Sequence, residues 1–170
     1  SSLRDLNAFH SAYAVSEEEK GRMRYFLMVN SVGREGEQGV IPYDPEAGVD
    51  ALIGALEASA DELLKKHGSP PLIFLSMDSI EFGYGEDDAL KLVGSISAWT
   101  RRNEGLSLLA DKLAYPEISE RLASVSSIHL RLTREHGCLL LYGVKPRTPL
   151  YAIKTDTQKG YYQTRLVPIT

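Results

Sequence analysis

The side chains in this sequence best suited to chemistry are two carboxylates and a hydroxyl at the end of an apolar run. Asp78 and Ser79 directly follow the run Leu72–Met77, and Glu81 lies three residues after Asp78. Asp78 could hold a Mg²⁺ ion through water, and Glu81 could orient a water molecule. The competing interpretation is structural, with Asp78 and Ser79 forming an Asx turn or a helix cap and Glu81 a solvated acid in a loop.

A second set of charged side chains lies in a proline-containing segment of the last third of the chain. Lys145 and Arg147 could contact an anion or an acidic partner, because Pro146 and Pro149 stiffen this segment and present both side chains to the same side. The alternative is that both are ordinary exposed cations without a specific partner.

The remaining histidine, cysteine and serine side chains show no spacing typical of a metal site or of a nucleophilic catalytic site. No pair of the four histidines has metal-ligand spacing on one element: His10, His67, His129 and His136. The single cysteine, Cys138, begins an apolar run and is predicted to be a buried structural thiol. Ser79 does not lie in a G-x-S-x-G elbow. We therefore predict no catalytic residue and no metal site.

Tyrosines cluster toward the end of the sequence. They are Tyr142, Tyr151, Tyr161 and Tyr162. Three cations lie near them: Lys154, Lys159 and Arg165. Such a set could stack on single-stranded nucleic acid, and it equally suits a half-buried sheet face or a protein interface.

The elements that must position these residues begin with an apolar strand and a helix. Residues 25–29 predict a buried strand, and the glycine-containing stretch 31–39 predicts a loop. Asp44-Pro45-Glu46 is a helix start signal. The apolar stripe from Val49 to Leu64 has helical spacing and ends before Gly68.

The same alternation continues through the middle of the chain. Residues 72–77 predict a strand buried on both faces, because the run is apolar without alternation. A helix follows over residues 86–103 with Trp99 in its core or at an interface, and a short strand over residues 106–110. Strands separated by helices in this way favour parallel pairing with the helices packed outside.

The last third has a different pattern. A short helix is predicted around residues 117–123, and residues 128–132 and 138–144 predict a hairpin. Two further strands are predicted over residues 150–154 and 162–167. This part should therefore be antiparallel.

Length and composition place limits on the class of protein. The 170 residues predict one domain, 1–170, with a flexible or helical arm over 1–24, an α/β core over 25–110 and an antiparallel part over 111–170. The net charge of -4 disfavours a dedicated nucleic-acid binder. No apolar run approaches the ~18–20 residues of a membrane span, so we expect no membrane partner. The single cysteine fits a reducing compartment, and we expect a cytoplasmic location.

The order of these elements resembles the later part of the RecA-like ATPase core, in its KaiC/RadA branch, over residues 44–168. Leu72–Ser79 is similar to the Walker B strand of that branch, and the strand ending Leu108-Leu109-Ala110 follows in order. Arg121–Leu132 is similar to the family's small helix leading into an edge strand. Gly143–Thr148 looks like its Lys-x-Arg segment, which in ring assemblies points toward the nucleotide of the neighbouring subunit.

The resemblance implies a mainly parallel sheet flanked by helices, with an antiparallel C-terminal hairpin or meander. It also implies that Asp78, Ser79 and Glu81 face nucleotide and Mg²⁺, and that Lys145 and Arg147 face an anion or a subunit interface. The chain departs from the family because it contains no G-x-x-x-x-G-K-[ST] loop to hold phosphates.

Three functions follow as alternatives. The first is a non-catalytic module without a bound cofactor, which contacts a protein partner or forms a homo-oligomer as a regulator or partner of an ATPase or ring assembly. The second is an ATPase that uses ATP and Mg²⁺ and whose phosphate loop lies outside this chain. The third is a single-stranded nucleic-acid-binding partner.

Overall fold

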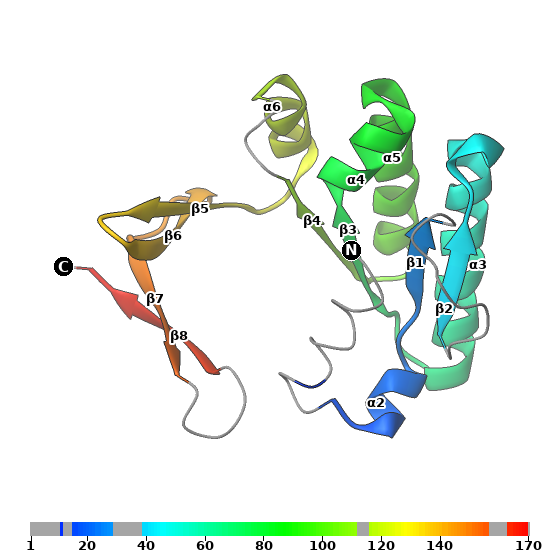
Figure 1. Cartoon of the computed structure of the whole chain (residues 1–170), viewed down its shortest axis with the longest axis horizontal. Helices are drawn as coiled ribbons and strands as arrows, with labels where there is room; N and C mark the ends of the chain where they lie inside the picture. Colours follow the sequence, from blue (N-terminus) through cyan, green and yellow to red (C-terminus); the bar gives the residue numbers. More distant parts are fainter. Residues whose placement is uncertain (1–10, 12–14, 29–38, 112–115, 157–162, 170) are drawn as a thin grey trace. The chain divides into compact units, whose positions relative to one another are not determined.

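The computed structural model describes residues 11, 15–28, 39–111, 116–156 and 163–169 (Figure 1). The chain divides into two compact units. The first unit comprises Ser1–Leu3 and Ser16–Ser119, and the second comprises Arg4–Val15 and Glu120–Thr170. The interpretation of the chain as one domain stays a prediction.

The first unit contains all the parallel strands of the described part. Its elements are α2 (Glu17–Gly21), β1 (Tyr25–Met28), β2 (Val40–Tyr43), the 3-10 helix η2 (Pro45–Ala47), α3 (Val49–His67), β3 (Leu72–Ser76), α4 (Met77–Tyr84), α5 (Glu86–Arg102) and β4 (Leu106–Ala110). β1 pairs with β2, and β3 pairs with β4, both in parallel.

The prediction of a mainly parallel, RecA-like sheet is wrong. The two parallel pairs are separate two-stranded sheets, and the largest sheet of the described residues is four-stranded and antiparallel. The apolar runs predict which segments are strands. They do not predict strand neighbours, because neighbours are chosen by contacts between segments that are distant in sequence.

The start signal that the sequence predicts for α3 belongs to the short 3-10 helix η2 that precedes it. The Asp44 carboxylate accepts a hydrogen bond from the Glu46 backbone N–H at 2.9 Å, but this cap begins η2 rather than α3. Gly48, with φ of 83°, separates η2 from α3, and α3 begins at Val49. The predicted end is confirmed, since Gly68 is left-handed and its N–H bonds to the Leu64 carbonyl at 2.8 Å.

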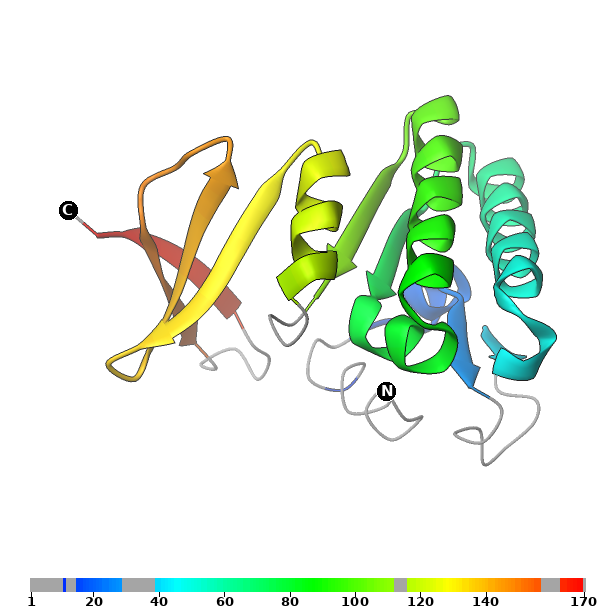
Figure 2. The same ribbon diagram turned by 90° about the horizontal axis from the view of Figure 1, so that it is seen from above.

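Helices α3 and α5 lie side by side (Figure 2), and their apolar stripes form the core of the first unit. Both stripes have helical spacing, so each helix presents one continuous apolar face. The buried side chains of the two helices are Val49, Leu52, Ala60, Leu63, Ala89, Leu92, Val93, Ile96, Trp99 and Thr100.

Three polar contacts fix how α3 and α5 meet, and we call this line of contacts the α3–α5 seam. They join Lys91 Nζ to the Asp50 carboxylate at 2.7 Å, Ser95 Oγ to Glu57 Oε1 at 3.0 Å and Trp99 Nε1 to Asp61 Oδ1 at 2.9 Å. Residue numbers rise together on both helices, so the helices run parallel. Trp99 is 1% exposed, and its hydrogen bond removes the cost of burying its N–H group.

The β3–β4 pair has one closed and one open face. Ile73 and Leu75 are buried, whereas the alternate positions on the same two strands are exposed. The exposed side chains, which form the open face of β3–β4, are Leu72 (58%), Phe74 (57%), Leu106 (63%) and Leu108 (48%). The prediction that β3 is buried on both faces is therefore wrong, because described residues cover only one side.

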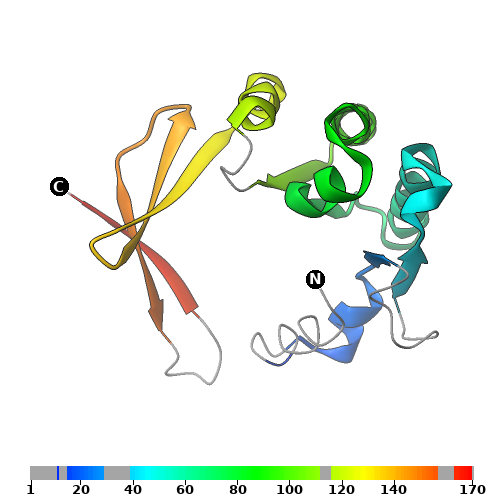
Figure 3. The ribbon, with the colours of Figure 1, turned by 45° about the horizontal axis from the view of Figure 1, so that its top comes forward.

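The division between the units falls within α6 (Pro116–Val125), where Ile118 and Leu122 are buried. The second unit then forms an antiparallel sheet in the order β5-β6-β7-β8, whose strands can be followed in Figure 3. The strands are β5 (His129–Glu135), β6 (Cys138–Lys145), β7 (Tyr151–Asp156) and β8 (Gln163–Pro168). Tyr162, the first residue of the predicted last strand, lies outside the described residues.

The hairpin predicted between residues 128–132 and 138–144 is present, with longer strands than expected. Glu135 pairs with Cys138, which leaves His136 and Gly137 as a two-residue turn. Both turn residues have positive φ, 48° and 80°, as in a type I′ turn whose twist matches that of the strands.

The two faces of the four-stranded sheet differ in polarity. Directly paired residues of antiparallel strands point to the same side, so the register assigns each side chain to a face. One side, the apolar face of β5–β8, carries mainly apolar side chains, together with Arg134, Thr155 and Thr164. Its apolar members are Leu130, Leu132, Leu139, Leu141, Tyr151, Ile153, Leu166 and Pro168. The other side, the polar face, surrounds the buried Leu140 with Arg131, Glu135, Cys138, Tyr142, Lys154, Asp156, Gln163 and Arg165.

Replacing Trp99 should weaken the first unit more than any replacement of an exposed aromatic residue. We expect Trp99→Ala to lower the free energy of unfolding by about 3–5 kcal/mol, through the cavity it leaves in the seam. Trp99→Phe should cost less, about 1–2 kcal/mol, since it mainly removes the hydrogen bond to Asp61. Urea unfolding followed by far-ultraviolet circular dichroism measures both. The control is Phe82→Ala, at a side chain that is 88% exposed. Equal losses for Phe82→Ala and Trp99→Ala would contradict the seam's role.

Candidate functional site

A cluster of carboxylates, the candidate site of the first unit, lies at the carboxyl ends of β3 and β4. Ser76 and Ala110 are paired at the ends of the two strands. Asp78 follows in the first turn of α4, and Asp111 comes directly after β4. The carboxyl ends of parallel strands are where open α/β sheets commonly bind ligands.

Glu81 lies one turn further along α4, so it is not the loop acid of the structural interpretation. Burial raises the pKa of Glu81, and the carboxylates of Asp111, Asp78 and Glu86 raise it further. The Glu81 Oε1 atom is buried and has no hydrogen-bond partner in the described part of the chain. We call Asp78, Glu81 and Asp111 the acidic edge.

Two further buried polar atoms without a hydrogen-bond partner in the described part accompany Glu81. They are Asp111 Oδ1 and the Tyr84 hydroxyl. Asp111 accepts a hydrogen bond from Ser119 Oγ. The Tyr84 ring stacks on Tyr43, with ring centroids 6.5 Å apart, and burial is the main cause that raises the pKa of both phenols.

This arrangement favours binding a proton. Desolvation and neighbouring carboxylates both disfavour the ionised form of Glu81. The described residues contain no group of three or more His, Cys, Asp or Glu side chains that could hold a metal ion. The roles of Asp78, Ser79 and Glu81 toward nucleotide and Mg²⁺ stay predictions.

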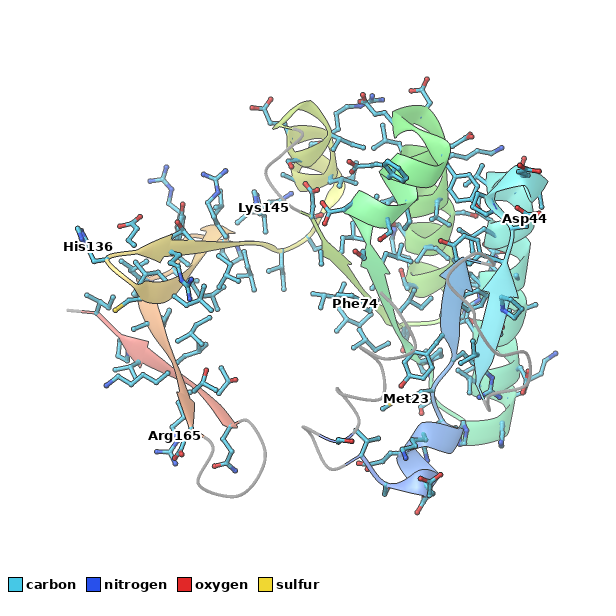
Figure 4. The ribbon with its side chains drawn as sticks, viewed as in Figure 1. Met23, Asp44, Phe74, His136, Lys145 and Arg165 are labelled. Atoms are coloured by element: carbon cyan, nitrogen blue, oxygen red, sulfur yellow. The ribbon has the colours of Figure 1, made fainter. Side chains whose placement is uncertain are left out.

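Lys145 and Arg147, the predicted anion or interface residues, belong to the second unit. The Lys145–Pro146 peptide bond is cis, and Arg147 forms a bridge back to Val144. Lys145, labelled in Figure 4, donates a hydrogen bond from Nζ to the Ser126 carbonyl at 2.7 Å. Arg147 is exposed and is the better placed of the two to meet a partner.

The predicted tyrosine platform is only partly within the described residues. Tyr142 lies on the polar face of the sheet and Tyr151 on the apolar face, so these two rings cannot stack on the same strand of nucleic acid. Tyr161, Tyr162 and Lys159 lie outside the described residues.

Cys138 is exposed, so the prediction of a buried structural thiol is wrong. It is the first residue of β6, next to the turn, and its side chain points to the polar face. Burial begins only with the apolar residues that follow it, Leu139 to Leu141, so the apolar run does not extend to the thiol itself.

Charge is distributed unevenly along the chain, a feature that the whole-chain balance conceals. Residues 1–119 contain 11 Lys and Arg and 20 Asp and Glu, a net charge of -9. Residues 120–170 contain eight Lys and Arg and three Asp and Glu, a net charge of +5. The two values add up to the -4 of the whole chain.

The positive charge of the second unit is not neutralised by ion pairs in its described residues. All four salt bridges found in the described residues lie in the first unit. Five cations of the second unit make no salt bridge to a described residue: Arg131, Arg134, Arg147, Lys154 and Arg165. On the polar face, Lys154 and Arg165 stand directly opposite each other, where like charges repel.

The apolar face of β5–β8 is the most extensive candidate interaction surface of the second unit. Leu130, Leu132 and Leu166 are 52%, 54% and 51% exposed, and between their strands lie the half-buried side chains of β6 and β7. A contiguous exposed apolar surface of this kind commonly marks a protein or ligand contact.

No protein-family model matches this chain, and no curated protein matches it. One solved structure with a similar chain is that of the uncharacterized protein PH0321 from Pyrococcus horikoshii, crystallised with an unknown peptide. The two chains are 13% identical with a TM-score of 0.49, over 76% of this chain and 60% of that one. This degree of likeness supports no inference about the function of this chain.

None of the helices among the described residues combines enough length with enough apolar character to cross a bilayer.

The acidic edge makes stability depend on pH through Glu81. Below the ordinary Glu pKa both the folded and the unfolded chain hold the proton, so the full stability is present. As the pH rises from that value through the raised pKa of the folded state, the unfolded chain loses its proton first and stability is lost.

We therefore expect Glu81→Gln to raise the melting temperature at pH 7, because it removes the desolvated carboxylate. The gain should disappear as the pH falls below the ordinary Glu pKa. Thermal melts of both proteins at a series of pH values measure this difference. Glu104→Gln, at an exposed position of the same unit, is the control. A Glu81→Gln gain that is independent of pH would rule out the electrostatic explanation.

Proposed function

We propose that this chain is a non-catalytic module that acts by protein–protein contact, as a regulator or partner of a larger assembly. The observation that carries the proposal is the exposed apolar face of β5–β8 on a unit of net positive charge. The sequence resemblance implies an ATPase or ring assembly as the partner class. A single exposed thiol, Cys138, suits a reducing compartment, so the proposed location is the cytoplasm.

The energetics of the apolar face support a binding role. Covering the exposed half of one leucine side chain contributes on the order of 1 kcal/mol. Leu130, Leu132 and Leu166 lie on the first and last strands of the sheet, so a partner that covers them must also cover the strands between. Such a contact has the apolar centre typical of specific interfaces. Arg134 on the same face, together with the net positive charge of the unit, would favour an acidic partner.

The acidic edge supports the non-catalytic part of the proposal. Its carboxylates repel phosphate unless a cation lies between them. The sequence also has no phosphate-binding loop.

Calorimetric titration with a slowly hydrolysed ATP analogue and Mg²⁺ tests whether the chain is a nucleotide enzyme. We expect no binding heat, because the sequence has no loop that could hold phosphates. Stoichiometric binding that disappears in Asp78→Ala would overturn the proposal in favour of an ATPase. Asp87→Ala, at an exposed acid in the first turn of α5, is the matched control.

The binding role has its own test once a partner has been purified. Leu132→Asp should raise the dissociation constant for that partner at least tenfold, since it places a charge on the exposed part of the apolar face. Thr133→Asp, the neighbouring position on the polar face, should change it little. Equal effects of the two substitutions would remove the apolar face from the interface.

A further inference from the structure

Two exposed apolar surfaces lie among the described residues, on units of opposite charge. The open face of β3–β4 belongs to the unit of negative charge, and the apolar face of β5–β8 belongs to the unit of positive charge. We infer that the apolar face of β5–β8 in one copy docks on the open face of β3–β4 in a second copy. The inference rests on the proposed function and names a partner for it.

Charge decides which pairs of faces can meet. Residues 1–119 carry -9 and residues 120–170 carry +5, so a contact between two identical faces brings together two bodies of the same sign. A contact between unlike faces brings opposite charges together, which speeds association and stabilises the encounter. A second copy of the chain therefore supplies both the apolar surface and the acidic body that the basic unit requires.

Both faces are surfaces of β-sheets, which can pack against each other. Each face belongs to a β-sheet, and two sheets pack face to face at about 10 Å when their side chains interdigitate. Phe74 and Leu108 are directly paired at the centre of the open face, and Leu132 and Leu141 are directly paired on the apolar face of the other sheet. Large side chains thus project from the middle of both surfaces.

The arrangement has a consequence for assembly size. A contact between unlike faces leaves one free face of each kind in a pair of chains, so further copies can add. The average mass of the particles should therefore increase with protein concentration instead of stopping at a dimer, unless the assembly closes. Salt should weaken the contact, because it screens the attraction between the two charged bodies.

Sedimentation velocity of the full chain and of two variants tests the inference. Phe74→Glu blocks the open face, and Leu132→Glu blocks the apolar face of β5–β8. We expect the wild-type chain to form assemblies whose mass rises with concentration, and each variant alone to be monomeric. An equimolar mixture of the two variants should form a 1:1 dimer, because each contributes the face that the other lacks, and the dimer cannot grow.

Controls separate loss of the contact from loss of the fold. Ala58→Glu and Ser127→Glu add the same charge at exposed positions outside both faces and should assemble like the wild type. Circular dichroism checks that each variant is folded. If Phe74→Glu is unfolded, Leu106→Glu on the same face replaces it, since Leu106 is 63% exposed.

Three results would overturn the inference. They are a wild-type chain that is monomeric at every concentration, a mixture of variants that stays monomeric, and a single variant that still dimerises through two identical faces. None of them bears on nucleotide binding, so the proposed function could survive with a different partner. Conversely, Asp78-dependent binding of Mg²⁺ and nucleotide would overturn the proposed function without changing the sedimentation result.

Discussion

The first unit depends on the seam between α3 and α5. Two-stranded parallel sheets are too small to be stable alone, and both pairs here need helices to cover them. The seam supplies that cover for the β3–β4 pair, where α5 packs against β4, through Trp99 and the apolar stripes on either side of it. Contacts such as Lys91–Asp50 fix the register of the helices. The exposed ion pair contributes little energy by itself, so apolar burial is the main stabilising term and the polar contacts mainly select one alignment.

The sequence predicts the elements better than their arrangement. Apolar spacing locates α3 and α5, and Gly68 ends α3 as expected, because these signals act within a few residues of the position they determine. The pairing of β1 with β2 rather than β3 depends on contacts across the chain, which no local pattern contains. The open side of β3 is unpredictable for the same reason, since an apolar strand looks alike whether one face or both are covered.

The candidate site could be predicted in part. Asp78 and Glu81 stand out by their position after an apolar strand, and Asp111, which was not predicted, holds the corresponding position after β4. The signal for it is present in the sequence, because an acid follows each strand of the β3–β4 pair. The period-two alternation at the start of β5 and the opposite charges of the two halves are likewise properties of the sequence itself. The raised pKa of Glu81 could not be predicted from the sequence, since it depends on burial and on carboxylates from different elements.

The position of Trp99 determines what the fluorescence of this protein reports. It is the only tryptophan of the 170 residues, and it lies in the first unit. Its fluorescence therefore reports on that unit alone, whereas circular dichroism averages over the whole chain. A difference between the two signals during denaturation would reveal whether the units lose their structure together or one after the other.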